Sequence, residues 1–232
     1  MSKIRILFIS FLFCLFLGHT KAQTPAATPS ETRAETRKTS TPYTGELSIF
    51  DSPGREERLH LDRVMDALGI APGKTVADIG AGGGWFTVRA AKRVTETGTV
   101  YAVDINPAAI RYIENRAHKE GLHNVKTILS KADDPSLPPN AVDAVLLLKT
   151  YHEVGQPISL LRNLRPALHL GARIGVIDRN GNGENHGVAP DIVIHEAEQA
   201  GYTLLAQYDF VKDDGMDYFL VFTAKPNPHD SQ

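Results

Sequence analysis

Two acidic residues and the glycines between them carry the clearest chemistry in this chain. An apolar run ends at Asp78, and Gly80, Gly82 and Gly84 follow at alternate positions before a predicted helix. Glycine lets a ligand approach the backbone closely, and the free N–H groups at a helix N-terminus attract polar ligand atoms. A second apolar run ends at Asp104, about twenty residues after Gly84, where nucleotide-binding α/β proteins place a carboxylate on the ribose. The pattern therefore predicts a binding site for a nucleotide or nucleoside.

The spacing within this motif favours an adenosine ligand with a positively charged tail over a dinucleotide. The dinucleotide motif G-x-G-x-x-G/A has its third small residue where this chain has Trp85, whose indole would obstruct the packing of helix against strand. A carboxylate such as Asp78 fits poorly beside a pyrophosphate but well beside an ammonium group. We therefore expect the ligand to be an adenosine that bears an amino-acid group.

These segments resemble the signature motifs of class I S-adenosylmethionine (SAM) dependent methyltransferases. Residues 75–91 resemble that family's motif I, residues 99–107 its following acidic motif and residues 142–148 its fourth strand. Residues 149–154, Lys-Thr-Tyr-His-Glu-Val, resemble the segment after that strand in a branch whose members are often exported. The chain departs from the family at 170–172, Leu-Gly-Ala, where many members have Pro-Gly-Gly. The resemblance implies SAM as the cofactor and methyl transfer as the activity.

The resemblance also implies roles for the residues of the cofactor site. Asp78 would receive the methionine ammonium group, and Asp104 would bind both ribose hydroxyls. Ile105 would face the adenine, and Asp133 would accept a hydrogen bond from the adenine amino group. Capping of a helix or turn is the alternative role for Asp104 and Asp133. The residues expected to bind the cofactor are Asp78, Gly80, Gly82, Gly84, Asp104, Ile105 and Asp133.

Polar residues after the fourth and fifth predicted strands are candidates for catalysis on the methyl acceptor. Tyr151, His152 and Glu153 directly follow the fourth strand, and Asp178 ends the fifth. An imidazole can take up a proton near neutral pH, so His152 is the candidate general base, with Glu153 orienting it or binding a polar substrate. A packing or capping role is the alternative for His152 and for Asp178. His186 lies in a glycine-rich loop that would either cover the pocket or stay in solvent.

The predicted elements alternate between strand and helix, which places these side chains at one edge of a parallel sheet. Helices are expected over 54–69 and 107–120, the latter with Asn106 as its cap and Gly121 at its end. Two final strands joined by a short turn predict an antiparallel hairpin. We expect an α/β fold with a doubly wound, seven-stranded, mostly parallel sheet and this C-terminal hairpin. The strand ranges are 75–79, 99–103, 124–129, 142–148, 173–178, 203–210 and 218–223.

Residues 1–22 have the form of a secretory signal peptide. Lys3 and Arg5 precede the apolar run 6–18, and small residues near position 22 suit cleavage. The pattern predicts a periplasmic or secreted protein with no stable membrane association after signal cleavage. A membrane anchor is the alternative, although the run is shorter than a bilayer span of about 20 residues. The one cysteine, Cys14, lies in this run, so the mature protein would have no disulfide and no thiolate metal ligand.

Length, composition and charge limit the remaining possibilities. The chain has 232 residues, enough for one good-sized core. Residues 23–44 are rich in Thr, Pro, Ala and Ser and predict a flexible linker, followed by a domain at 45–225 and a tail at 226–232. A formal net charge of −2 and the lack of a basic, aromatic-rich segment argue against nucleic acid and for a small-molecule substrate. The sequence does not indicate an oligomeric state.

Three functions are consistent with these patterns. The first is a SAM-dependent methyltransferase that acts on a small molecule by direct methyl transfer with general-base assistance. The second is an exported, non-catalytic module that binds an adenosine ligand, because SAM is made and used in the cytoplasm whereas this chain is predicted to be exported. The third is a nucleotide-dependent oxidoreductase, which Trp85 and the terminal hairpin oppose.

Overall fold

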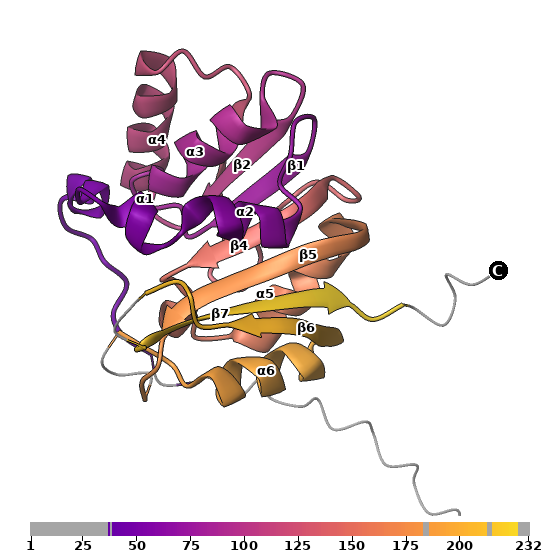
Figure 1. Ribbon diagram of the computed structural model, residues 1–232. Coiled ribbons are helices and arrows are strands. Elements are labelled where there is room, and N and C mark those ends of the chain that lie inside the picture. The colour runs from indigo at the N-terminus through magenta and orange to yellow at the C-terminus, as the bar shows by residue number, and fades with distance from the viewer. Residues whose placement is uncertain (1–36, 38, 183–185, 213–214, 227–232) are drawn as a thin grey trace, which may run out of the picture. The chain divides into compact units, whose positions relative to one another are not determined.

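Seven strands form one sheet with the order β3-β2-β1-β4-β5-β7-β6 (Figure 1). The computed structural model describes residues 37, 39–182, 186–212 and 215–226. Neighbouring strands from β3 to β5 are parallel, and β7 inserts between β5 and β6 antiparallel to both. The predicted doubly wound fold with a C-terminal antiparallel pair is therefore confirmed. The strands are β1 (Thr75–Ile79), β2 (Thr99–Asp104), β3 (Val125–Leu129), β4 (Val142–Leu148), β5 (Leu168–Arg179), β6 (Tyr202–Tyr208) and β7 (Asp217–Ala224).

Helices cover both faces of the sheet because successive strand residues point to opposite sides. Val76 packs in a hydrophobic cluster with side chains of α2 and α3, whereas its neighbour Ala77 packs in a second cluster with those of α5 and α6. Figure 1 shows α2 in front of the sheet and α5 behind it. The helices are α1 (Arg55–Arg58), α2 (Leu61–Leu68), α3 (Trp85–Val94), α4 (Pro107–Lys119), α5 (Pro157–Leu164) and α6 (Pro190–Gln199), with short 3₁₀ helices η1 (Leu47–Asp51), η2 (Tyr151–Glu153) and η3 (Arg165–Ala167).

The leading helix, expected over 54–69, is divided in the structure. His60 has a φ of 47°, a left-handed conformation that no continuous α-helix contains, so α1 ends before it and α2 begins after it. The break allows Leu59 and Leu61, on either side of His60, to be buried together with the apolar face of α2. The prediction of one continuous helix was wrong because the apolar pattern spans the break without revealing it.

Two other elements follow or extend the prediction. The helix cap at Asn106 is confirmed, since its side chain accepts a hydrogen bond from the Ala108 N–H at 2.8 Å. The fifth strand begins at Leu168 instead of residue 173, because Leu168 already pairs with Val142 of β4 before a register shift in which Gly171 has a φ of 78°. Leu170, in the segment that departs from the family's Pro-Gly-Gly, is 96% exposed. That departure therefore lies at the start of the strand, away from its carboxyl end.

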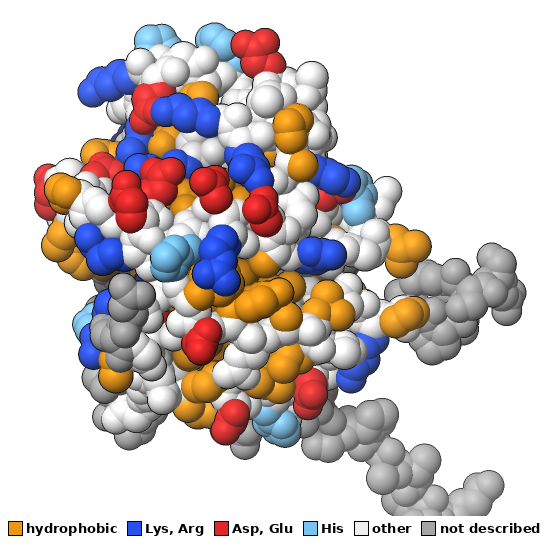
Figure 2. Space-filling view, in the orientation of Figure 1, with side chains coloured by type: hydrophobic (Ala, Val, Ile, Leu, Met, Phe, Trp, Pro, Cys, Tyr) orange, Lys and Arg blue, Asp and Glu red, His pale blue; other side chains and the backbone are white. Residues whose placement is uncertain are grey.

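The surface in the view of Figure 2 combines paired charges with an apolar area. Arg89 pairs with Glu56, and Arg93 pairs with Asp62, so acids of α1 and α2 neutralise arginines of α3. Hydrophobic side chains gather over β5, β7 and β6, where no helix lies in front of the sheet in this view (Figures 1 and 2). Among the residues that the structure describes, no helix is both long and apolar enough to cross a bilayer.

All of these elements belong to one unit of the chain, Ala34–Gln232. The predicted signal peptide, residues 1–22, lies outside the described residues together with Cys14. Most of the predicted linker, 23–44, and residues 227–232 of the predicted tail also lie outside them.

Candidate active site

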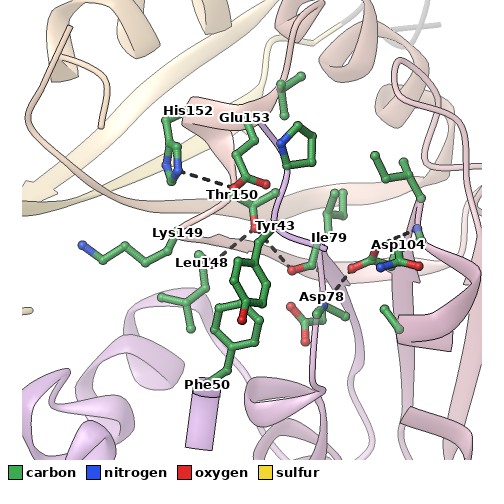
Figure 3. A pocket seen from close by; sticks show the side chains of 18 of the residues that line it. Tyr43, Phe50, Asp78, Ile79, Asp104, Leu148, Lys149, Thr150, His152 and Glu153 are labelled. Atoms are coloured by element: carbon green, nitrogen blue, oxygen red, sulfur yellow. Dashed lines mark hydrogen bonds and ion pairs between the residues drawn. The ribbon is translucent and has the colours of Figure 1, made fainter. Parts of the chain in front are cut away.

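A pocket of about 800 Å³ opens at the carboxyl edge of the sheet, between β1 and β4. The strand order reverses here, since β2 lies on one side of this pair and β5 on the other. In open α/β sheets, ligands bind in the crevice at such a reversal. Figure 3 shows Asp78, Asp104, His152 and Glu153 around this pocket. The motifs that follow β1, β2 and β4 in the sequence therefore meet at one site.

The glycine-rich turn after β1 forms part of the pocket wall. Gly80 donates its N–H to the Val103 carbonyl at 2.8 Å, which ties the turn to β2. Gly80 has a φ of 73°, and a side chain at this position would collide with Thr150. Gly82 also lines the pocket, and a Cβ atom there would contact the Phe50 ring at 3.4 Å. At both positions the absence of a side chain leaves the backbone accessible from the pocket.

The Asp104 carboxylate is held by backbone N–H groups while it lines the pocket. Its Oδ2 atom accepts from Gly82 and its Oδ1 atom from Asn106, both at 2.8 Å. Each carboxylate oxygen keeps a further lone pair for a ligand. Ile105, the next residue, is 47% exposed and lines the same pocket. Asp104 thus orders the two turns, as the capping alternative expected, and is also placed to bind a ligand.

Asp78 is a buried carboxylate at the centre of the pocket wall, only 2% exposed. Burial raises the pKa of Asp78 to about 7, and a hydrogen bond from Thr87 Oγ1, at 2.6 Å, and the nearby Arg55 partly oppose the increase. A cationic ligand beside this carboxylate would stabilise its ionised form. The site therefore fits a ligand with an ammonium group, as SAM has.

Two of the residues predicted to bind the cofactor do not line the pocket, namely Gly84 and Asp133. Gly84 precedes α3 with a φ of 71°, and a Cβ atom there would lie 3.0 Å from Ile113 of α4, so this glycine allows the two helices to pack. Asp133 follows Ala132, which does line the pocket, and the Asp133 carbonyl accepts a hydrogen bond from Asn163 at 2.8 Å. Cofactor contacts of these two residues stay predictions.

His152 lies on the opposite side of the pocket from Asp104 (Figure 3) and forms a buried hydrogen-bonded pair with Asp178. The Nδ1 atom of His152 lies 2.8 Å from Asp178 Oδ1, and the His152 backbone N–H donates to Oδ2 at 3.0 Å. Asp178 is fully buried, whereas His152 lines the pocket. An ionised carboxylate only accepts hydrogen bonds, so the imidazole proton resides on Nδ1 and Nε2 is left as the acceptor.

Glu153 and His186 lie beside this pair, and both line the pocket. The Glu153 Oε1 atom is 3.9 Å from His152 Nε2, and the His186 ring stands nearly perpendicular to the His152 ring with 5.7 Å between centroids. Burial raises the pKa of Glu153, which the neighbouring His152 and His186 partly counteract. The structure thus brings together four polar side chains that the sequence marked separately, and this group can take up or release protons.

Tyr151 is placed away from the pocket, although it adjoins His152 in the chain. It is completely buried within the hydrophobic cluster that α5 and α6 share with the sheet. The Arg37 guanidinium lies 5.2 Å from the centre of its ring, and burial raises the pKa of the Tyr151 hydroxyl well above its usual value. In this structure Tyr151 anchors η2 and does not contact the pocket.

The sequence patterns missed a pocket wall formed by residues near the N-terminus of the domain. Tyr43 and Phe50 line the pocket and pack edge to face, 5.4 Å between ring centres (Figure 3). Arg37 holds this segment in place, because its guanidinium donates to the carbonyls of Tyr151 at 2.6 Å and Val154 at 3.2 Å. The sequence feature that could have revealed this wall is Tyr43, an aromatic residue within a Thr- and Pro-rich stretch.

Lys149 and Thr150, directly after β4, were also missed, and both line the pocket. Lys149 has a φ of 57°, and its Nζ atom lies 2.5 Å from Asp217 Oδ1. Thr150 donates from Oγ1 to the Gly80 carbonyl at 3.3 Å. These contacts join the end of β4 to the glycine turn and to β7, and no local sequence pattern indicates them.

The fold, the glycine turn and the two carboxylates near the ends of β1 and β2 define an α/β protein that binds a nucleoside with a charged tail. A family model described as "Methyltransferase domain" matches residues 70–207. This match covers more than half of the chain, which therefore belongs to the methyltransferase domain family, a class I family whose cofactor is SAM.

Several known proteins are similar to the chain. A ubiquinone/menaquinone biosynthesis C-methyltransferase of Citrobacter koseri is 28% identical over 115 residues, which are 49% of this chain and 46% of that protein. An aklanonic acid methyltransferase of Streptomyces sp. strain C5 is 32% identical over 114 residues, 48% of this chain and 51% of that protein. Among solved structures, a SAM-dependent methyltransferase from Aquifex aeolicus superposes with a TM-score of 0.69 at 26% identity, over 76% of this chain and 95% of that one.

The matched part of this chain spans about half the length of the two curated relatives. The family model, over residues 70–207, includes β1, β2 and the glycine turn that surround the cofactor side of the pocket. The family membership therefore accounts for the cofactor site, whereas the acceptor side must be interpreted from the side chains that surround it.

Proposed function

We propose that the protein transfers the methyl group of SAM to a small-molecule acceptor that binds beside His152. The observation that carries this proposal is the buried His152–Asp178 pair, with His152 in the same pocket as Asp78 and Asp104. In Figure 3, His152 and Glu153 lie on one side of the pocket and Asp104 on the other. An acceptor beside His152 would therefore share the pocket with the cofactor.

Different residues of the chain bind the cofactor and remove the proton from the acceptor. SAM supplies a methyl group that its sulfonium has already activated. Asp78 and Asp104 hold the cofactor by charge and hydrogen bonds, while the glycine turn lets it lie against the backbone. His152 Nε2 takes the proton of the acceptor, and Asp178 keeps the imidazole in the required tautomer and stabilises its charged form.

The names of the relatives favour a small organic acceptor, since one acts in ubiquinone and menaquinone biosynthesis and the other on aklanonic acid. The direct test is product formation by the full chain from SAM that carries a labelled methyl group, with small hydroxyl, amino and carbon-acid compounds as acceptors. Labelled product that depends on His152 supports the proposal. Tight SAM binding by calorimetry with no product from any acceptor would instead support the non-catalytic adenosine-binding module.

We also propose that the protein is exported and that its mature N-terminus lies within a few residues of Gln23. The support is the sequence pattern alone, in which Lys3 and Arg5 precede an apolar run and small residues near position 22. Mass spectrometry of the protein from its native host tests this. Membrane-bound protein that retains residue 1 would favour the alternative of a membrane anchor.

A further inference from the structure

Three side chains suited to metal binding meet on the acceptor side of the pocket: His152, Glu153 and His186. One potential ligand atom from each lies within 4.8 Å of the other two. The pair His152 Nε2 and Glu153 Oε1 is separated by 3.9 Å. We propose that these three residues bind a divalent transition-metal ion, best matched by Zn²⁺, which in turn binds the methyl acceptor.

The contact between His152 and Asp178 supplies an observation that the three ligand residues alone do not. Histidines that bind metal almost always donate their second N–H group to a carboxylate, carbonyl or water. Here the fully buried Asp178 lies 2.8 Å from His152 Nδ1 and also accepts from the His152 backbone N–H. This arrangement fixes the ring and leaves Nε2 directed toward Glu153 as the available ligand atom.

The set of donors determines the kind of ion. Two imidazoles and one carboxylate suit zinc and its first-row neighbours, whereas calcium and magnesium prefer oxygen ligands throughout. Three protein ligands with a fourth position open are typical of catalytic zinc sites. Bonds of about 2.0–2.2 Å place the donors of a tetrahedral site about 3.4 Å apart, so the observed separations must shorten. His186 is exposed, so its side chain can move closer by rotation.

The open position gives the metal a role in the proposed methyl transfer, and this role rests on that proposed function. All three ligand residues line the pocket, so a hydroxyl group of the acceptor reaches the ion there. Binding to the ion would lower the pKa of that hydroxyl, and its proton would leave to solvent. The oxygen would then bond to the methyl carbon while the bond from that carbon to sulfur breaks, with S-adenosylhomocysteine as the leaving group. With the ion bound, His152 Nε2 is a ligand and cannot take up the proton, so the ion replaces the general-base role of His152 and leaves the rest of the proposed function unchanged. The predicted acceptor is therefore a small molecule with a metal-binding hydroxyl group.

Metal binding itself can be measured without a known acceptor. The full chain, free of any histidine tag, is stripped with a chelator and titrated with Zn²⁺ in competition with a chromophoric chelator, and with Co²⁺ by absorption spectroscopy. We expect one ion per chain. His186→Ala and Glu153→Ala should each weaken binding about tenfold or more, because each removes one of three ligands. His195→Ala is the matched control, since this exposed histidine contacts Gln199 on α6 instead.

Calorimetry with SAM on the same variants separates this proposal from the proposed function. Affinity for SAM should change by less than about twofold in His186→Ala, because the cofactor residues lie on other turns. Failure of the wild-type chain to bind one ion would overturn the metal site, as would binding that neither variant weakens. If the wild-type chain failed to bind SAM or to transfer a methyl group, the result would count against the proposed function and not against the metal site.

Discussion

The cofactor side and the acceptor side of the pocket are built in different ways. On the cofactor side, backbone hydrogen bonds fix the site, such as Gly82 N–H to Asp104 and Gly80 N–H to Val103. On the acceptor side, His152, Asp178 and His186 come together from separate segments of the chain. The first side can change little without loss of the turn, whereas the second can change through a few side chains. The comparison teaches that backbone geometry fixes the cofactor side of this pocket, whereas a few side chains determine its acceptor side.

The largest effect should come from His152→Ala, which removes acceptor chemistry and spares the cofactor side. Turnover should fall by roughly 10²–10⁴ fold, as expected for loss of general-base assistance or of a metal ligand. Affinity for SAM, measured by calorimetry, should change by less than about twofold. Full turnover in this variant would show that the acceptor side works without the imidazole, and the division between the two sides would then be wrong.

The converse test is Asp104→Ala, which should weaken SAM binding by about tenfold or more. Charge-assisted hydrogen bonds that ligand hydroxyls donate to a carboxylate are each worth about 1.5–3 kcal/mol. Asp133→Ala provides the comparison, since Asp133 does not line the pocket and should cause a smaller loss. Circular dichroism checks that the turn survives. An unchanged dissociation constant for SAM in a folded Asp104 variant would show that Asp104 does not bind the ribose.

A pH experiment tests the electrostatics of the cofactor side, with a moderate expected effect. The pKa of Asp78 is raised to about 7, so its protonated form favours the folded state. That contribution to stability is present below about pH 4 and is lost as the pH rises through about 7. Thermal unfolding without SAM should therefore show wild-type stability falling over this range. Asp78→Asn should lack this decrease and should be the more stable protein at pH 8.

SAM should reverse part of this loss, because an ammonium group binds the ionised carboxylate better than the protonated one. The affinity of the wild type for SAM should thus be several-fold higher at pH 8 than at pH 6, and SAM should stabilise the fold correspondingly more at pH 8. Equal affinity at both pH values would place the ammonium group away from Asp78.

The smallest effect is expected from Arg37→Ala, which loosens the N-terminal wall. Arg37 donates to two carbonyl groups of the η2 segment and pairs with Glu196 at 3.1 Å. Hydrogen bonds to charged groups contribute about 1.5–3 kcal/mol each, part of which water would replace. We expect a lower melting temperature and a few-fold higher KM for the acceptor, with the KM for SAM less affected. A change confined to the KM for SAM would assign the wall to the cofactor side.

The sequence was most informative where neighbouring residues decide the structure. The glycine turn, Asp78 and Asp104 are recognisable because the turn directly follows β1 and each aspartate lies at or near the carboxyl end of its own strand. The pairing of His152 with Asp178 was not predicted, since 26 positions separate them and only the β4–β5 register joins them. Tyr151 illustrates the limit at a single position, because its place beside His152 in the chain does not reveal that it points into the core.

The N-terminal wall has a consequence for the order in which the active site is completed during synthesis. Arg37 emerges before any strand of the sheet, yet its partner Glu196 lies 159 positions later, in α6. Contacts between such distant positions form late, since most of the chain must be ordered before they are made. A nascent chain that ends before α6 holds every residue predicted to bind the cofactor but lacks the last anchor of the pocket wall. The set of contacts that holds Arg37 is therefore complete only when nearly the whole domain has left the ribosome.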